Sequence, residues 1–347
     1  MPLKFLLPWS RPKAKPKTKS RKSVYVTRRF PDSGILALKK KGYAVEVYPE
    51  DQIIPRKLLL QKVRGVDALL SLLTDRIDDE VLKAAGPQLK IVANYAVGFD
   101  NVDVAAAKKR GIVVTNTPSD KVNEAVAEHT FALMISLARR IPEADVFSKS
   151  KKYTGWSPNN FIGTDLYGKT LGIIGAGRIG AAAARRGVKG FGMRLVYSDM
   201  RACPQIEKEL GAKRLTMEKL LQTSDFVSLH VPLLPSTRHL ISIAELTLMK
   251  KTAFIINTAR GPVVDEKALL RALKTKRIAG AGIDVFECEP AIDCDLTDNL
   301  ELRSFPNVIL TPHIASATIE ARQAMSLVAA QNIIAVLSGN PALNPAK

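Results

Sequence analysis

Cysteine, histidine and aromatic residues are scarce in this chain of 347 residues, which has three cysteines, four histidines and an aromatic fraction of 6%. Cys203, Cys288 and Cys294 show neither CxxC spacing nor a Cys/His ligand pattern, so a structural zinc site and a disulfide scaffold are not expected. We therefore predict no metal. The small, odd cysteine count is typical of a reducing compartment and predicts a cytoplasmic protein.

Long apolar runs are also absent from the sequence. No stretch reaches about 18 uncharged apolar residues, so no membrane-spanning helix is expected. The first residues form a short apolar patch that Pro8 interrupts, and the basic residues follow this patch, whereas a secretory signal has the reverse order. An apolar fraction of 46% and a charged fraction of 24% are ordinary for a globular protein, and the length is typical of two domains.

Acidic residues are missing from residues 1–22, which contain eight basic ones. The other 325 residues carry 44 basic and 33 acidic groups, so +11 of the net charge of +19 lies outside this segment. Lysine alternating with proline predicts a disordered basic tail. We interpret the tail as a dispensable extension; the alternative is a weak anchor to nucleic acid or anionic lipid, because basic segments attract anions.

Short apolar strands alternate with amphipathic helices from Ser23 onward. The first series of strands is predicted at 23–27, 44–48, 67–73, 90–96 and 112–116. A long helix is predicted from about 122 to 140, and a polar stretch follows at 150–168. The second series of strands is predicted at 170–175, 194–199, 225–231, 253–259, 279–285 and 307–312, before a last helix at 317–337. This alternation predicts two α/β domains, each with a mostly parallel sheet between helices.

A glycine-rich loop, GAGRIG, lies between a predicted strand and an alanine-rich helix, and Asp199 ends the next strand. Such a unit binds a dinucleotide, with the pyrophosphate at the helix N-terminus. A carboxylate at Asp199 would accept ribose hydroxyls and repel a 2′-phosphate, which predicts NAD(H) over NADP(H), although Arg201 would weaken that preference. The alternative is an ordinary turn beside an exposed aspartate. The cofactor-binding residues predicted from this unit are Gly175, Gly177, Arg178, Ile179, Gly180 and Asp199.

The four histidines fall at different places in this pattern. His313 directly follows a predicted strand, and ligands of open α/β sheets bind beyond the carboxyl ends of the strands. We therefore predict His313 as the acid/base residue. His230 ends another strand and lies where it would line a cofactor cleft, whereas we interpret His129 and His239 as structural or solvated.

Two further strand ends carry charged residues. Arg260 follows the strand at 253–259, and Glu287 and Glu289 follow the strand at 279–285. Each of these groups can be an ordinary loop charge. An arginine, carboxylates and a histidine at three strand ends near one dinucleotide loop favour a catalytic site.

Five motifs together resemble the D-2-hydroxyacid dehydrogenase family, and most of all its glyoxylate/hydroxypyruvate reductase branch. They are NYAVGFDNVD (94–103), GAGRIG (175–180), NTARGPVVDE (257–266), GIDVFECEP (282–290) and TPHIASAT (311–318). The resemblance spans roughly residues 23–342. It implies two Rossmann-like open parallel-sheet domains with a cleft between them: a flavodoxin-like substrate domain of 23–117 and 318–347, and an NAD-binding Rossmann domain of 118–317.

The resemblance also implies a role for each motif residue. Arg260 would bind the substrate carboxylate and polarise the carbonyl, and His313, oriented by Glu289, would be the acid/base. The backbone of Val97 and Gly98 would bind the substrate carboxylate, so that the substrate contacts are made by Val97, Gly98, Arg260 and His313. Asp284 would contact the nicotinamide carboxamide. The other implied cofactor contacts are Val231 and Pro232 on the adenine side, and Thr258 and Ala259 on the nicotinamide side.

These residues predict NAD(H)-dependent reduction of a small 2-oxo acid, glyoxylate or hydroxypyruvate, to the D-2-hydroxy acid. Alternatives of the same chemistry are a D-lactate or a phosphoglycerate dehydrogenase. An alternative of another class is a non-catalytic, NAD-sensing protein that resembles a corepressor of this family. The resemblance implies a homodimer in which Trp156 reaches the neighbour's active site; the other interpretation is that Trp156 packs in its own loop.

Overall fold

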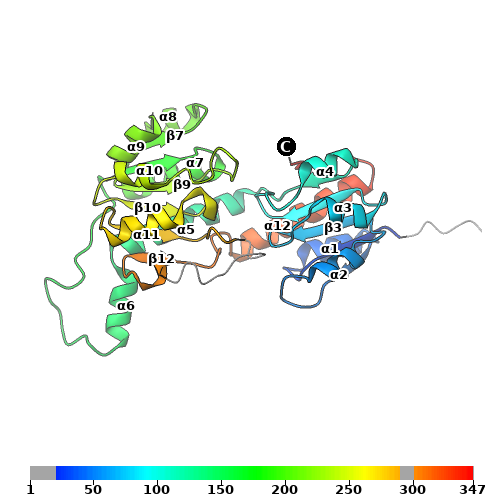
Figure 1. The fold of residues 1–347 in the computed structure, drawn as a ribbon, viewed down its shortest axis with the longest axis horizontal. Coiled ribbons are helices and arrows are strands. Elements are labelled where there is room, and N and C mark those ends of the chain that lie inside the picture. Colours follow the sequence, from blue (N-terminus) through cyan, green and yellow to red (C-terminus); the bar gives the residue numbers. More distant parts are fainter. Residues whose placement is uncertain (1–20, 290–300, 347) are drawn as a thin grey trace, which may run out of the picture.

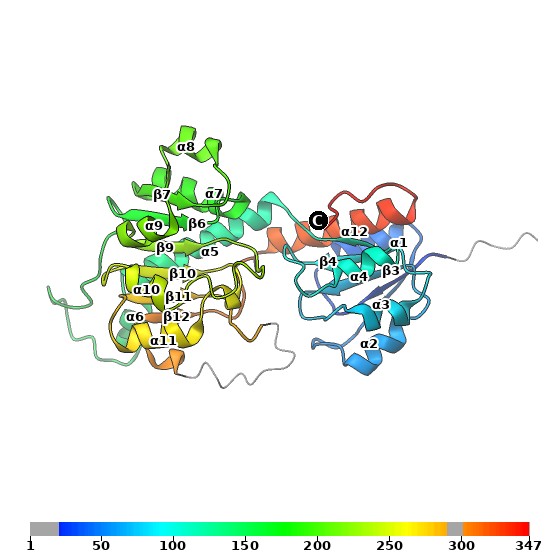
Figure 2. The same cartoon turned by 45° about the horizontal axis from the view of Figure 1, so that its top comes forward.

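Two parallel β-sheets organise the chain, as the sequence predicted. The computed structural model describes residues 21–289 and 301–346, so most of the predicted tail over 1–22, Cys294 and the last residue of the GIDVFECEP motif lie outside the described residues. Figure 1 and Figure 2 show the two sheets in two lobes, with helices on both faces of each sheet. The predicted fold class, two open α/β domains, is confirmed.

The first sheet has five parallel strands in the flavodoxin-like order β2-β1-β3-β4-β5. The interior strand β4 is buried along its whole length, because helices cover both faces of the sheet. The strands are β1 (Ser23–Val26), β2 (Ala44–Val47), β3 (Ala68–Leu72), β4 (Ile91–Tyr95) and β5 (Val113–Thr115). The helices of this lobe are α1 (Ser33–Lys40), α2 (Arg56–Lys62), α3 (Asp79–Ala85), α4 (Val104–Lys109) and the C-terminal α12 (Ile319–Leu337).

The second sheet has seven parallel strands in the order β12-β11-β10-β9-β6-β7-β8. The chain leaves β6 toward β7 and later returns to pair β9 on the other side of β6, which creates the switch point where open α/β sheets bind ligands. The strands are β6 (Thr170–Ile174), β7 (Arg194–Ser198), β8 (Lys213–Arg214), β9 (Phe226–Leu229), β10 (Phe254–Asn257), β11 (Gly280–Ile283) and β12 (Val308–Leu310). The helices are α5 (Asp120–Ala138), α6 (Ile141–Lys149), α7 (Arg178–Arg185), α8 (Pro204–Leu210), α9 (Met217–Thr223), α10 (Ile243–Leu248) and α11 (Glu266–Lys274).

The C-terminal helix α12 packs on the first sheet, beside α1 and β4 (Figure 1). The approach to α1 is very close: a Cβ at Gly34 would lie 2.1 Å from the Ser326 carbonyl oxygen. The Gly34 N–H donates to the Ser326 hydroxyl (2.8 Å), and the Tyr95 hydroxyl donates to the Arg322 carbonyl (2.8 Å). The strands β1 to β5 and the helix α12 therefore share one lobe, although they lie far apart in the sequence. The domain boundaries near 117 and 317 stay a prediction.

The helix predicted over 122–140 is in fact followed at once by a second one. Helix α5 ends at Ala138, Arg140 takes a left-handed conformation (φ 53°), and α6 starts with Pro142 in its first turn. Proline is well tolerated there, because the first turn of a helix needs no intrahelical N–H donor. From the sequence, Pro142 indicated only the end of the helix over 122–140, and α6 was therefore not predicted. Among residues 21–289 and 301–346, no helix combines the length and apolarity that a bilayer crossing requires.

Candidate active site

The glycine-rich loop joins β6 to α7. Gly175 has a φ of 93°, and a Cβ there would lie 2.7 Å from the His230 carbonyl carbon and oxygen. A Cβ at Gly180 would lie 2.0 Å from the Gly175 carbonyl oxygen, so this position holds the helix against the loop. Gly177 caps α7 without any side-chain hydrogen bond and has open space where a Cβ would be. The N–H groups of the first turn of α7 are therefore approachable by an anion.

Asp199 lies just after β7, beside this loop. Its carboxylate accepts hydrogen bonds from the N–H of Ala176 (2.8 Å) and the N–H of Arg201 (3.0 Å). The Arg214 guanidinium binds the Asp199 carbonyl (2.9 Å) rather than the carboxylate. The structure thus places a negative charge next to the glycine-rich loop, with arginines nearby.

His313 and Glu289 form a pair at the ends of two adjacent strands. The Nδ1 atom of His313 lies 2.6 Å from Oε2 of Glu289. His313 has a left-handed backbone (φ 53°), and its N–H donates to the Asp284 carbonyl (2.8 Å). Both side chains are about three-quarters buried. The pair brings an imidazole and a carboxylate together in the arrangement typical of an oriented acid/base.

The carboxylate of Asp284 organises the loop that carries His313. It is completely buried and accepts hydrogen bonds from the Thr311 hydroxyl (2.6 Å) and from the N–H groups of Ile314 and Ala315 (2.9 Å each). Burial raises the pKa of this carboxyl, but the hydrogen bonds outweigh burial and hold the pKa below its usual range. The contact of Asp284 with a nicotinamide carboxamide stays a prediction. The observed partners of the carboxylate are the 311–315 loop and His129 of α5, whose Nε2 lies 3.3 Å from Oδ1.

Arg260 reaches from the end of β10 toward the first lobe. Its Nε donates to Oδ1 of Asp100 (3.1 Å), and its Nη1 donates to the Ala259 carbonyl (2.8 Å). The guanidinium lies directly against Gly98, since a Cβ at Gly98 would be 1.6 Å from Nη2. Glycine is required at this position for Arg260 to lie against the 97–98 backbone.

A cleft of about 310 Å³ lies between the two lobes and collects most of the predicted residues. A narrow hollow at its inner end is lined by Arg260, Glu289 and His313. Arg178, Asp199, Asp284 and the three loop glycines do not line this cleft. The predicted residues that line it are Val97, Gly98, Ile179, Val231, Pro232, Thr258, Ala259, Arg260 and His313.

Three asparagines without a predicted role hold the backbone at 97–98 in place. The buried Asn94 donates to the Gly98 carbonyl (3.0 Å) and to Oδ1 of Asn101 (2.9 Å). Asn116 donates to the Val97 carbonyl (2.7 Å). Two of these asparagines lie in the NYAVGFDNVD motif, and their place in this motif is the feature of the sequence from which a role could have been predicted. They fix the backbone at Val97 and Gly98 in the cleft.

The other histidines have structural partners. Burial lowers the pKa of His230 to about 4, and its Nε2 lies 2.9 Å from the Ser228 hydroxyl. His230 lines the cleft but is neutral near pH 7, so it is no proton donor there. The His129 ring lies 3.0 Å from the Thr311 hydroxyl, behind the His313 loop. This agrees with the interpretation of His129 as structural.

Comparison with known proteins gives one family. Residues 131–315 match the family described as "D-isomer specific 2-hydroxyacid dehydrogenase, NAD binding domain". The chain is 51% identical over 323 residues to a glyoxylate reductase of Thermococcus kodakarensis, covering 92% of this chain and 94% of that one. It is 52% identical over 320 residues to a glyoxylate reductase of Thermococcus gammatolerans, covering 91% and 93%.

Solved structures of similar fold include complexes with both nicotinamide cofactors. A D-lactate dehydrogenase from Aquifex aeolicus, complexed with NAD and lactic acid, has a TM-score of 0.81 and 30% identity, covering 92% of this chain and 96% of that one. A glyoxylate/hydroxypyruvate reductase from Sinorhizobium meliloti, described as NADPH-dependent and in complex with NADP and malonate, has a TM-score of 0.81 and 33% identity, covering 94% and 97%.

Proposed function

Because the chain belongs to the D-isomer specific 2-hydroxyacid dehydrogenase family, we propose that it uses NADH to reduce glyoxylate to the achiral glycolate, and hydroxypyruvate, as a second substrate, to the D-2-hydroxy acid. It is an oxidoreductase that uses a nicotinamide cofactor. The observation that carries the proposal is the meeting of Arg260 with the His313–Glu289 pair in one hollow of the cleft.

The residues beside the glycine-rich loop fit a dinucleotide. The unobstructed backbone at Gly177 and the uncapped first turn of α7 suit a pyrophosphate, and the carboxylate of Asp199 suits the ribose hydroxyls. Val231, Pro232, Thr258 and Ala259 then border the path from this loop to His313. When bound, a reduced nicotinamide supplies the hydride.

The substrate is held by two sides of the cleft. The Arg260 guanidinium, already fixed by Asp100 and the Ala259 carbonyl, presents its remaining N–H groups to the carboxylate and the carbonyl oxygen of a 2-oxo acid. The backbone at Val97 and Gly98 binds the same carboxylate from the first lobe. The polarised carbonyl carbon becomes a better hydride acceptor, because negative charge develops on an oxygen that faces a cation.

The proton comes from His313. Its Nδ1 is held by the Glu289 carboxylate, so Nε2 is the nitrogen that carries a proton toward the carbonyl oxygen. As the hydride arrives at carbon, the proton moves from Nε2 to that oxygen, and the alcohol forms. Glu289 stabilises the imidazolium before the transfer and keeps the ring oriented after it.

The proposal is tested by following the loss of NADH absorbance with glyoxylate, hydroxypyruvate and pyruvate in parallel. We expect turnover with glyoxylate and hydroxypyruvate, and the highest kcat/KM with glyoxylate. Tight NADH binding without turnover of any 2-oxo acid would contradict the proposal and favour the NAD-sensing alternative.

Replacing Asp199 by asparagine is expected to change the cofactor preference. The variant keeps the size of the side chain but removes the charge that repels a 2′-phosphate and that accepts ribose hydroxyls. A charged hydrogen bond contributes about 1.5–3 kcal/mol, so the ratio of kcat/KM with NADPH to that with NADH should rise at least about tenfold. Steady-state kinetics with both cofactors measures the ratio, and Glu218→Gln on α9 is the matched control. An unchanged ratio would show that Asp199 does not select the cofactor.

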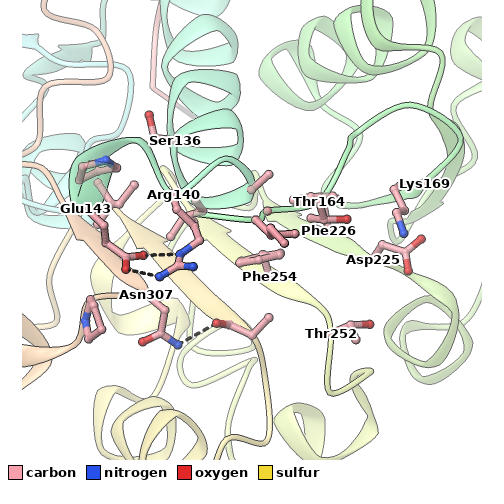
Figure 3. Close-up of a pocket in the computed structure, with 18 of the residues that line it drawn as sticks. Ser136, Arg140, Glu143, Thr164, Lys169, Asp225, Phe226, Thr252, Phe254 and Asn307 are labelled. Atoms are coloured by element: carbon pink, nitrogen blue, oxygen red, sulfur yellow. Dashed lines mark hydrogen bonds and ion pairs between the residues drawn. The ribbon is translucent and has the colours of Figure 1, made fainter. Parts of the chain in front are cut away.

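We further propose that the protein is a homodimer built on α6 and the segment that follows it. Helix α6 buries none of its side chains, although a helix of nine residues needs packing to be stable in water. Figure 3 shows the adjoining cavity of about 460 Å³, where Phe226 and Phe254 lie near the Arg140–Glu143 ion pair. The exposed large apolar side chains of residues 141–167 are Ile141, Val146, Tyr153, Trp156, Ile162 and Tyr167.

Trp156 is 83% exposed, which contradicts the interpretation that it packs in its own loop. Trp156→Asp is expected to raise the dimer dissociation constant about thirtyfold, since a tryptophan at an interface contributes about 2 kcal/mol or more. Sedimentation equilibrium measures this constant against the chain mass of 37.9 kDa. Leu36→Asp, on α1 and 61% exposed, is the control and should leave the dimer intact. A wild-type chain that sediments as a monomer would refute the dimer.

A further inference from the structure

His239 lies between the two loops that carry the charged residues of the candidate active site. The segment 238–242 runs alongside the Arg260 loop: the His239 N–H donates to the Pro262 carbonyl (2.7 Å), and the Ile241 N–H donates to the Val263 carbonyl (3.1 Å). The Asp265 N–H returns a bond to the Ile241 carbonyl (2.9 Å). The backbone of His239 is therefore fixed to the Arg260 loop.

The side chain of His239 holds the other loop. Its Nε2 forms a short ion pair with Oε1 of Glu287, and the Arg238 guanidinium lies 3.7 Å from the same oxygen. Glu287 is two residues before Glu289 and is itself anchored, because its N–H donates to Oε1 of Glu266 (2.6 Å). The loop then turns back toward His313 through a bond from the Glu289 N–H to the Phe286 carbonyl (3.1 Å).

The loop 260–263, which carries Arg260, also touches the loop 286–289, which carries Glu289. The relative position of these two loops is therefore sensitive to the His239–Glu287 ion pair. A Cβ at Gly261 would lie 1.7 Å from the Phe286 carbonyl oxygen, so the residue after Arg260 packs against the start of the Glu289 loop. Gly261 itself contributes no side chain that would lock the two loops together. Groups at the edge of the contact, His239 with Glu287 among them, therefore help to set the register of one loop on the other.

We propose that His239 is a positioning residue, which through Glu287 sets the distance and orientation of the His313–Glu289 pair relative to Arg260. This inference rests on the proposed reduction of a 2-oxo acid. Hydride transfer with protonation requires that the Arg260 guanidinium and the His313 imidazole contact the same carbonyl oxygen at the same time. A displacement of about 1 Å between such groups lowers the reaction rate strongly. The left-handed backbone of His239 (φ 50°) agrees with a residue whose place is dictated by its contacts.

The test compares His239→Ala, His239→Gln and Glu287→Gln with the wild type. His239→Ala should lower kcat for glyoxylate on the order of tenfold to a hundredfold. The Kd for NADH should be unchanged, because His239 does not line the cleft. His239→Gln, whose amide can still donate to Glu287, should retain more activity than His239→Ala. The double variant with Glu287→Gln should lose little more than His239→Ala alone, since both substitutions break one ion pair.

Two readouts separate positioning from a loss of stability. The pH profile of kcat/KM should shift in His239→Ala, because Glu289 no longer holds His313 in the same way; the charged groups around His239 are Arg238, Glu287 and Asp265, and all remain. Lys189→Ala, which breaks the remote Lys189–Glu209 ion pair (2.5 Å), is the matched control and should keep the wild-type profile. A variant with a lower Tm but wild-type kcat and pH profile would overturn the proposal.

Hydrogen exchange distinguishes failure of this inference from failure of the proposed function. Amides of residues 260–263 and 286–289 should exchange faster in His239→Ala than in the wild type, whether or not any 2-oxo acid is turned over. Faster exchange with an inactive wild type would support the link between the loops and reject the proposed substrate. Unchanged exchange with an active wild type would reject the link alone.

Discussion

Arg260→Ala is expected to lower kcat/KM for glyoxylate about a thousandfold. The substitution removes the forked donor that binds the substrate carboxylate and the charge that polarises the carbonyl, and it leaves Asp100 without its partner at 3.1 Å. Loss of charge-assisted bonds that strengthen in the transition state costs about 4 kcal/mol, which corresponds to this factor. Because these contacts serve binding and chemistry together, KM should rise and kcat should fall.

Two comparisons make the Arg260 experiment specific. Arg260→Lys keeps the charge but not the planar fork, so it should recover only a small part of the lost kcat/KM. Arg110→Ala, which breaks a surface pair with Asp79 (2.6 Å) in the first lobe, should have wild-type kinetics. NADH affinity, measured by fluorescence titration, should be the same in all three variants. An Arg260→Ala enzyme within tenfold of the wild type would refute the assigned role.

His313→Gln is expected to lower kcat about a thousandfold while changing KM little. The variant lacks the proton donor, and general acid catalysis contributes roughly 10²- to 10⁴-fold to the rate. The wild-type pH profile of kcat/KM should contain a limb that reports the His313–Glu289 pair, and this limb should disappear in the variant. Glu289→Gln should retain the limb in shifted form, because the imidazole remains but has lost its carboxylate partner at 2.6 Å.

Tm and NADH affinity show whether His313→Gln damages the structure as well as the chemistry. The Asp284 bonds to the 311–315 loop do not involve the imidazole, so His313→Gln should keep the wild-type Tm and NADH affinity. Normal folding with normal kcat would mean that another group protonates the substrate. Buried His230 is not that group at neutral pH, because its pKa is about 4.

The sequence predicted the two sheets well, because β-branched runs bounded by glycine and separated by amphipathic helices are a local pattern. It missed α6, because a proline after a predicted helix indicates the end of that helix, whereas Pro142 lies in the first turn of a second helix. The order of the seven strands is not local information. It depends on the pairing of β6 with β9 on the side away from β7, and the residues that meet there are 55 positions apart in the chain.

In the candidate site, the charged residues at strand ends could be predicted from the sequence. The residues that hydrogen-bond to them and hold them in place could not. Arg260 and His313 stand out because charged groups after apolar strands meet at one edge of a sheet. Asp100 lies 160 residues from Arg260, and no spacing rule connects them. The same holds for His239 and Glu287, whose side chains meet across 48 residues. The interactions that position a catalytic group could therefore be identified only from the three-dimensional structure.

The return of α12 to the first sheet has a consequence for synthesis on the ribosome. The seven-stranded lobe has all its strands once β12 has emerged, whereas the five-stranded lobe lacks the cover that Ala329, Ala330 and Ile333 provide until α12 has emerged. Even β5 is tied to the C-terminus, through a bond from the Ala346 N–H to the Val114 carbonyl (2.9 Å). The lobe that is translated first is thus the lobe that finishes folding last, and its apolar sheet face stays exposed or bound to a chaperone until α12 has emerged.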